Sequence, residues 1–275
     1  MRPLSAWPVA DRARVVGVFT DIDDTLTTDG AITPDALAAL EALHAAGLTV
    51  IPITGRPIGW SEAFARTLPV DALVAENGAA AWVFEVKKGQ AGNTGGTLLL
   101  SKWYQQDVAT RARNFARMQQ AAQRVLREVA GAHLAEDSPG RECDMAIDHS
   151  EFHHLDAPRI AAVVRILREE GMNATVSSIH INGWYGTHHK LDGAHWIVRE
   201  RLGRDLDREI HRWVYVGDST NDQRMFEAFP HSIGVANIRR FLPELTHQPR
   251  YVTPSERGAG FAEVVRHLLA HRRAA

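Results

Sequence analysis

Short apolar runs rich in β-branched residues alternate with helix-forming segments, and this alternation constrains the fold more than any other feature of the chain. Near the N-terminus, apolar runs at 15–20, 48–54 and 72–77 are separated by helix-forming segments at 33–47 and 60–68. Short apolar runs bounded by turn residues predict buried strands, and strands that alternate with helices predict βαβ units. The sequence therefore predicts an α/β fold with a Rossmann-like parallel sheet.

The alternation is interrupted after residue 82. An expected hairpin has the stretch KKGQAGNTGG as its turn, and it is followed by helices at about 105–130 and 156–171 and by alternating, half-exposed stretches at 141–149 and 173–183. The first pattern then resumes with helices at 190–203, 221–229 and 256–270 and strands at 212–218 and 231–236. We therefore expect a core of residues 1–82 and 183–275 and an inserted α+β cap domain of residues 83–182.

Composition narrows the class of protein. A formal net charge of −2 over 275 residues argues against partners such as nucleic acid or an anionic membrane. No apolar run approaches the roughly 20 residues of a membrane-spanning helix, and the N-terminus lacks the apolar stretch of a signal peptide. Cys143 is the only cysteine, so no intramolecular disulfide forms. We expect a cytoplasmic enzyme or binding protein for small molecules, and the oligomeric state stays open.

The first strand ends in three carboxylates within four positions, Asp21, Asp23 and Asp24. In an open parallel sheet, ligands bind beyond the carboxyl ends of the strands. Polar residues also follow three other strands, in ITGRP, ENGA and VGDSTND, so we expect Asp218 and Asp222 to converge on the first cluster. Crowded carboxylates repel unless a cation lies among them, and Mg²⁺ binds a few carboxylates while leaving room for a phosphate oxygen. The sequence therefore predicts half of a Mg²⁺ site, completed by a substrate phosphate.

This arrangement favours phosphoryl transfer. A carboxylate at the position of Asp21 can attack phosphorus and form an aspartyl-phosphate, and Asp23 can act as general acid and then as general base. Thr54 and Lys190 would stabilise the charge of the transferring group. Thr25 and the backbone amides near it would complete a phosphate cradle. The expected metal-site residues are Asp21, Asp23, Asp218, Asn221 and Asp222, the last two orienting the metal from beside it.

The motifs DIDDT, ITGRP, HHKLDG and VGDSTND resemble, in order and spacing, the four motifs of the haloacid dehalogenase superfamily of phosphatases. The insertion and ENGA resemble subfamily IIB with its C2 cap, and the whole pattern is similar to the sucrose-phosphate-phosphatase-like group. The resemblance implies a Mg²⁺-dependent phosphatase that acts on a phosphorylated metabolite, most naturally a sugar phosphate. Asp24 departs from the glycine that is usual there, and Asp23 argues against the dehalogenase branch.

Several residues are candidates for contact with the substrate, and alternatives remain for each. Arg56 could bind phosphate or form a salt bridge, Trp184 could stack on a sugar ring or pack in the hinge, and Lys102 competes with Lys190. His188 and His189 fit no zinc pattern. The candidate substrate-binding residues are Thr25, Gly55, Arg56, Asn77, His180, Asn182 and Trp184, and the cap adds Arg141 and Asp148.

Two other functions stay open on the sequence. A phosphomutase of the same fold would reuse the aspartyl-phosphate instead of hydrolysing it. A sugar-phosphate-binding sensor would bind the same ligand without turnover, although all the catalytic side chains are present. A dinucleotide-binding role lacks support, because no G-x-G-x-x-G follows the first strand.

Overall fold

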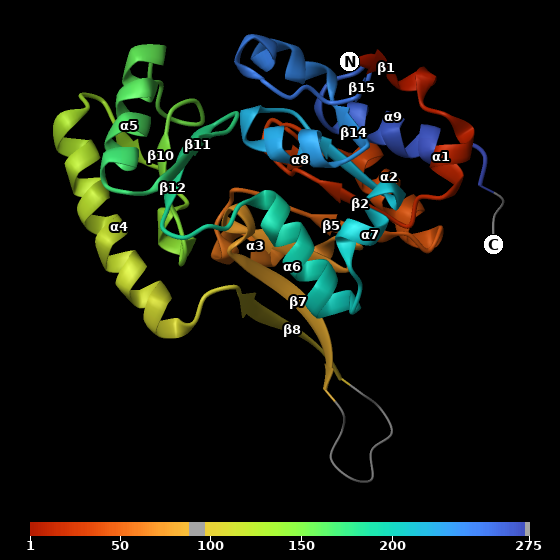
Figure 1. The fold of residues 1–275 in the computed structure, drawn as a ribbon, viewed down its shortest axis with the longest axis horizontal. Coiled ribbons are helices and arrows are strands. Elements are labelled where there is room, and N and C mark those ends of the chain that lie inside the picture. Colours follow the sequence, from red (N-terminus) through yellow and green to blue (C-terminus); the bar gives the residue numbers. More distant parts are fainter. Residues whose placement is uncertain (88–96, 273–275) are drawn as a thin grey trace.

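A computed structural model describes residues 1–87 and 97–272 of the chain (Figure 1). Most of the expected turn KKGQAGNTGG, residues 88–96, lies outside the described ranges. The central sheet has six strands in the order β1-β15-β14-β13-β2-β5, and all neighbours are parallel. This confirms the predicted parallel α/β core. Its strands are Arg2–Pro3 (β1), Tyr251–Val252 (β15), His231–Gly234 (β14), Trp213–Gly217 (β13), Gly17–Thr20 (β2) and Thr49–Pro52 (β5).

Helices cover both faces of this sheet. On each face, the apolar sides of the helices pack against the strands and form a separate core. On one face, α2 (Pro34–Ala45), α3 (Ile58–Thr67) and α9 (Arg257–Leu269) bury residues such as Leu40 and Phe261. On the other face, α6 (Lys190–Leu202) and α8 (Gln223–Ala228) pack around Trp213 and Tyr215, which the sequence predicts to be core. Shorter elements are α1 (Val9–Ala13), α7 (Leu206–Glu209), β3 (Thr27–Thr28) and β4 (Ala31–Ile32).

The expected hairpin pairs with the core. Its strands β7 (Ala80–Lys87) and β8 (Thr97–Tyr104) continue antiparallel from β6 (Ala72–Ala75), and a parallel bridge between Ile53 and Val74 joins β6 to the end of β5. In Figure 1 the hairpin projects away from the body of the protein. This pairing argues that the insertion begins later than residue 83, near residue 105.

A second lobe lies beside the core in Figure 1 and has a four-stranded antiparallel sheet, in the order β11-β12-β10-β9. Its own apolar cluster includes Met118, Val125, Ile147 and Ile181, so the lobe has a core separate from those of the main sheet. Its elements are α4 (Val108–Glu128), β9 (His133–Leu134), β10 (Met145–Asp148), α5 (Ala157–Glu169), β11 (Asn173–Val176) and β12 (His180–Trp184). We call this lobe the cap.

Two details of the cap differ from expectation. The alternating stretch 173–183 forms two strands, β11 and β12, with a turn between them, rather than one. The apolar residues that predict the inner face of the long helix are Phe115, Met118, Ala122, Val125 and Val129. Four of them are buried, but Phe115 is 37% exposed. Phe115 lies in the first half of α4, which extends past the edge of the cap sheet (Figure 1).

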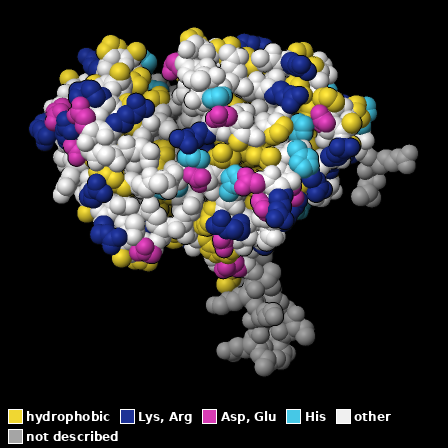
Figure 2. Space-filling model, viewed as in Figure 1, with side chains coloured by type: hydrophobic (Ala, Val, Ile, Leu, Met, Phe, Trp, Pro, Cys, Tyr) yellow, Lys and Arg dark blue, Asp and Glu magenta, His cyan; other side chains and the backbone are white. Residues whose placement is uncertain are grey.

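In the ranges that the structure describes, no helix combines the length and apolarity needed to cross a membrane. Figure 2 shows basic and acidic side chains mixed over one face of the molecule rather than gathered in a patch of one sign. This distribution agrees with the nearly balanced charge of the sequence.

Candidate active site

The site lies at the carboxyl ends of β2 and β13. Asp21 directly follows β2, and Asp218 directly follows β13. Lys190, the first residue of α6, reaches across this edge of the sheet. Its Nζ donates to Asp21 Oδ1 at 2.9 Å and to Asp222 Oδ1 at 2.7 Å, and all three residues are buried. The sequence predicted this convergence. The competing Lys102 instead pairs with Glu142 at 2.7 Å.

Asp21, Asp218 and Asp222 could together hold a metal ion, because one ligand atom from each lies within 4.8 Å of the others. Asp218 fits a cation best: its Oδ1 is buried and has no hydrogen-bond partner among the described residues. Its Oδ2 accepts from Asn237 Nδ2 at 2.9 Å. A buried carboxylate oxygen without a partner is costly unless a cation contacts it. The residues present therefore fit the Mg²⁺ that the sequence predicted.

The oxygens of Asp222 already have protein partners. Oδ1 accepts from Lys190 and from the Tyr215 hydroxyl, and Oδ2 accepts from the backbone amides of Asp218 and Ser219. Asp222 therefore holds the loop and the lysine in position beside the metal site. Asn221 lies next to it and accepts at Oδ1 from Ser219 Oγ at 2.9 Å. Sequence reasoning missed Asn237, which carries no motif and contacts Asp218 from the segment after β14.

Burial and like charge both act on these groups. Burial raises the pKa of Asp21 to about 7, Lys190 opposes the shift, and Asp222 and Asp23 add to it. Burial and then the nearby carboxylates of Asp21 and Asp222 raise the pKa of Asp218 well above its usual range. Burial alone would lower the pKa of Lys190, but Asp21 and Asp222 raise it above its usual value. The lysine is therefore a fixed positive charge, and the carboxylates have less countercharge than they need.

Asp23 lies outside this cluster, and its carboxylate pairs with Arg56. The guanidinium contacts Asp23 at 3.0 Å from the core, and it contacts Asp137 at 3.1 Å and Glu151 at 2.6 Å from the cap. His180 Nε2 lies 2.7 Å from the second oxygen of Glu151. Arg56 forms a salt bridge, as one alternative predicts, but it is buried rather than exposed, and the phosphate contact stays a prediction. Arg56 thus links the predicted general acid to the cap.

The threonines line the same edge of the sheet. Thr54 is fully buried, and its Oγ1 accepts from the amide of Arg56 at 3.0 Å. Thr25 Oγ1 is buried and lacks a partner within the described part of the chain. Its hydroxyl is therefore available to a ligand, as the predicted phosphate cradle requires.

Other candidate substrate-binding residues form a polar contact between core and cap. Asp144 Oδ2 accepts from Asn77 Nδ2 at 3.2 Å and from Asn182 Nδ2 at 3.1 Å, and Arg141 pairs with Asp144 Oδ1 at 2.7 Å. The Gly55 carbonyl accepts from Arg141 at 2.9 Å and from Asn182 at 3.2 Å. These residues converge near the loop that follows β5, and their contact with a substrate stays a prediction.

Two further candidates serve the cap itself. Trp184 packs in the cap core, its Nε1 donates to the His188 carbonyl at 2.8 Å, and it also lines the cleft between cap and core, so stacking on a sugar ring stays a prediction. The Asp148 carboxylate accepts four backbone amides, from Ser150 to His153, and shapes the loop that carries Glu151.

Glu76, in the ENGA motif, is a residue whose role the sequence did not predict. Its carboxylate is fully buried and accepts backbone amides from Ile58 of the core and from Glu142, Cys143 and Asp144 of the cap. Burial, followed by the charge of Asp144, raises its pKa to about 7. A buried acid between a strand and a turn was the available signal, but its partners in the cap lie 66 to 68 residues away.

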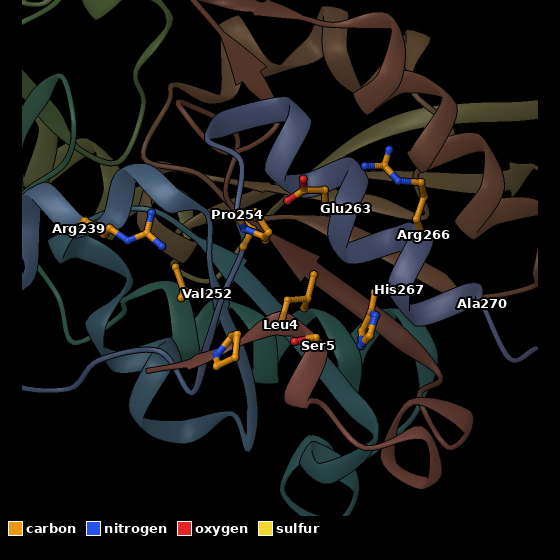
Figure 3. A pocket seen from close by; sticks show the side chains of 11 residues that line it. Leu4, Ser5, Arg239, Val252, Pro254, Glu263, Arg266, His267 and Ala270 are labelled. Carbon is orange, nitrogen blue, oxygen red and sulfur yellow. The ribbon is translucent and has the colours of Figure 1, made fainter.

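Two hollows frame the search for a substrate site. A cleft of about 610 Å³ lies between cap and core and includes Asn77, Lys190 and Asn221 in its lining. Another hollow, of about 640 Å³, lies by β1, β15 and α9, as Figure 3 shows, and is lined by residues such as Leu4, Arg239 and His267. The clustered carboxylates line neither hollow, but the first includes Lys190 and Asn221, which lie beside them, and the second includes no candidate site residue among the described residues that line it.

Residues 18–92 match the family model of haloacid dehalogenase-like hydrolases. This match agrees with the resemblance of the motifs, and the chain has the fold of a haloacid dehalogenase-like hydrolase with an inserted cap. No curated protein sequence matches the chain significantly.

Solved structures with the same fold cover nearly the whole chain. A protein of Thermoplasma acidophilum is 17% identical with a TM-score of 0.66, and the alignment covers 92% of this chain and 98% of that one. The sucrose-phosphatase of Synechocystis is 15% identical with a TM-score of 0.61, covering 92% and 97%. A sugar phosphatase of haloacid dehalogenase subclass IIB is 18% identical with a TM-score of 0.59, covering 91% and 98%. At these identities the similarity establishes the fold.

Proposed function

We propose that this protein is a Mg²⁺-dependent phosphomonoester hydrolase that acts on a sugar phosphate through an aspartyl-phosphate on Asp21. The observation that carries the proposal is the buried pairing of Lys190 with Asp21 beside a carboxylate oxygen of Asp218 that has no partner within the described ranges. One buried site thus holds a nucleophile (Asp21), a fixed positive charge (Lys190) and a carboxylate oxygen of Asp218 that can bind a metal ion.

The chain's own residues divide the reaction into two steps. The Asp21 carboxylate attacks phosphorus, the bond to the leaving oxygen breaks, and Asp23 gives that oxygen a proton. Asp23 then takes a proton from a water molecule, which attacks the phosphorus and releases phosphate and free Asp21. Lys190, Thr54 and the free hydroxyl of Thr25 would hold the phosphoryl oxygens during both steps.

Asp21 and Asp218 would hold the Mg²⁺, and Asp222 and Asn221 would orient them from the loop after β13. Asp23 is also expected at the metal. Because its carboxylate pairs with Arg56, its contribution to the metal site would come from its position in the loop after β2. When bound, the ion supplies positive charge that neutralises the phosphate and the crowded carboxylates.

The sugar phosphate rests on two supports. Proteins of the same fold are a sucrose-phosphatase and a sugar phosphatase. The polar residues Asn77, His180 and Asn182 lie where the cap meets the core, and they suit recognition of hydroxyl groups. A cap domain from about residue 105 to 188 and a cytoplasmic location, in keeping with the single cysteine, are parts of the same proposal.

The test is phosphate release from a panel of phosphorylated metabolites by wild type and by Asp21→Asn. We expect Asp21→Asn to abolish release, whereas the matched control Asp35→Asn, on the exposed start of α2, retains it. Release by Asp21→Asn at the wild-type rate would refute the nucleophile. Isomerised product formed in the presence of a bisphosphorylated sugar would favour the mutase, and binding without release would favour the sensor.

A further inference from the structure

The cleft between cap and core has an unusual charge balance. Its cap side includes Arg168, at the end of α5, and its core side includes Arg224, on α8. Lys190 also lines it, and no aspartate or glutamate is among the described residues that do. Lys190 is already paired with Asp21 and Asp222. Arg168 and Arg224 therefore supply the unbalanced positive charge, and without a lining acid among the described residues the cleft favours anions.

The two arginines are available for a ligand. Arg168 and Arg224 are exposed, and neither forms an ion pair with any residue in the described ranges. Most other arginines near the cap are paired, for example Arg124 with Glu169 and Glu170. An arginine presents a planar fork of donors that matches a carboxylate or a phosphate.

Unpaired polar atoms in the cleft provide an independent observation. His188 and Thr175 both line it, and both His188 Nε2 and Thr175 Oγ1 are buried without a partner among the described residues. Burial, followed by the charge of His189, lowers the pKa of His188 to about 4, so the imidazole is neutral at pH 7 and can donate one hydrogen bond. Buried polar atoms without partners are uncommon and indicate a missing ligand or water.

The cleft has a fixed position relative to the chemistry. Thr220 Oγ1 donates to the Val176 carbonyl at 2.6 Å, so the core loop and cap strand β11 touch at its border. Lys190 connects the cleft to the carboxylate cluster, because it lines the cleft and its ammonium contacts Asp21. A volume of about 610 Å³ accommodates the body of a phosphorylated sugar, and Lys190 is the lining residue that connects the cleft to Asp21.

From this geometry we propose that the substrate carries a second anionic group, a carboxylate or a phosphate on the leaving group, and that Arg168 and Arg224 bind it with help from Thr175 and His188. This inference rests on the proposed function, because it assigns the substrate class of the same site. The cap then selects phosphate esters by an acid group distant from the bond that breaks.

The test compares three substrates that differ in their leaving groups: glucose 6-phosphate, 6-phosphogluconate and fructose 1,6-bisphosphate. We expect kcat/KM of the wild type to be highest for one of the two acid-bearing compounds, which also tells a carboxylate from a phosphate. Arg168→Gln and Arg224→Gln should each lower the ratio of that value to the value for glucose 6-phosphate by about tenfold, mainly through KM. Arg201→Gln, an exposed charge-matched control on α6, should leave the ratio unchanged.

Calorimetric binding of the same compounds to Asp21→Asn protein separates this inference from the proposed function. If the acid-bearing compound binds more tightly, and Arg168→Gln and Arg224→Gln remove the preference, the anion subsite stands even where no phosphate is released. Preference for glucose 6-phosphate in both assays, or an equal loss for all three compounds in the arginine variants, would overturn the subsite while leaving the phosphatase proposal intact.

Discussion

Asp218 and Asp222 lie four residues apart in one loop, yet their surroundings separate their functions. Asp222 accepts hydrogen bonds from Lys190, Tyr215 and two backbone amides, so it has a structural task without any ligand. Asp218 keeps one buried oxygen free of partners among the described residues. Replacing each with asparagine should therefore produce different defects.

We expect Asp218→Asn to weaken Mg²⁺ binding, because it removes a charged ligand. Phosphate release should fall by at least about 100-fold at low Mg²⁺ and recover in part as Mg²⁺ rises. Asp222→Asn should lower activity and thermal stability together, with no recovery at high Mg²⁺. A titration of rate against Mg²⁺ for both variants checks this, and identical curves would contradict the division of tasks.

Glu76 supports a second prediction at the scale of one residue. In Glu76→Gln, the amide nitrogen would face backbone N–H groups that now donate to a carboxylate, so at least one donor loses its acceptor. We expect the free energy of unfolding to fall by about 1–3 kcal/mol. Chemical denaturation measures this, with Glu62→Gln on the exposed face of α3 as control. A change no larger than that of the control would mean that the cap loop 142–144 does not depend on Glu76.

The sequence predicted the residues that belong to short motifs after strands, and it did not predict their partners. Asp21, Lys190 and Asp222 converge because parallel strands end at one edge, a rule that needs no coordinates. Arg56 pairs with Asp137 and Glu151, which follow it in the sequence by 81 and 95 residues and belong to the cap. Their meeting depends on how the cap docks, which local patterning does not encode.

At the scale of elements, the predictions were wrong where an alternating pattern of apolar and polar residues fits more than one arrangement of strands. In residues 173–183 the apolar positions shift from even (Ala174, Val176) to odd (Ile179, Ile181). This shift is the signal of the turn at Ser177 and Ser178, which no glycine or proline marks. The alternation of strands β7 and β8 is that of a separate antiparallel sheet. In the structure, however, β7 pairs with the edge of β6, and this pairing extends the core.

The joint between the loop after β5 and the cap makes a prediction about pH. Hydrogen bonds from His180 and Arg56 outweigh burial and lower the pKa of Glu151 to about 2 from a usual value of 4.5. A lowered carboxylate pKa stabilises the fold above about pH 4.5, and the contribution disappears as pH falls toward 2.

Glu151→Gln should therefore destabilise the protein at pH 7 by up to about 3 kcal/mol, and the gap to wild type should narrow as pH falls below 4.5. Unfolding free energies measured from pH 7 down to pH 3 check the sign. A gap that stays constant or widens toward acid would show that the ion pair of Arg56 with Glu151 does not stabilise the contact between core and cap.

For the molecule as a whole, the proposed Mg²⁺ site would couple folding to metal binding. A ligand that binds only the native state, present at 100 times its dissociation constant, stabilises it by about 2.7 kcal/mol. We expect Mg²⁺ to raise the melting temperature by roughly 5 to 10 °C and a chelator to reverse this. Calorimetric scans test it, and Asp218→Asn should lose the shift. An unchanged melting temperature in wild type would argue against a native Mg²⁺ site.

The cap has an apolar cluster of its own, with Met118, Val125, Ile147, Ile166 and Ile181, and meets the core through polar contacts. Such a lobe can accumulate substitutions on the surface that faces the site without disturbing the buried packing of either part. Lineages of this protein could therefore acquire new metabolic tasks by varying one module while the machinery for breaking the ester stays the same. Grafting the lobe onto a related core would transfer its choice of metabolite.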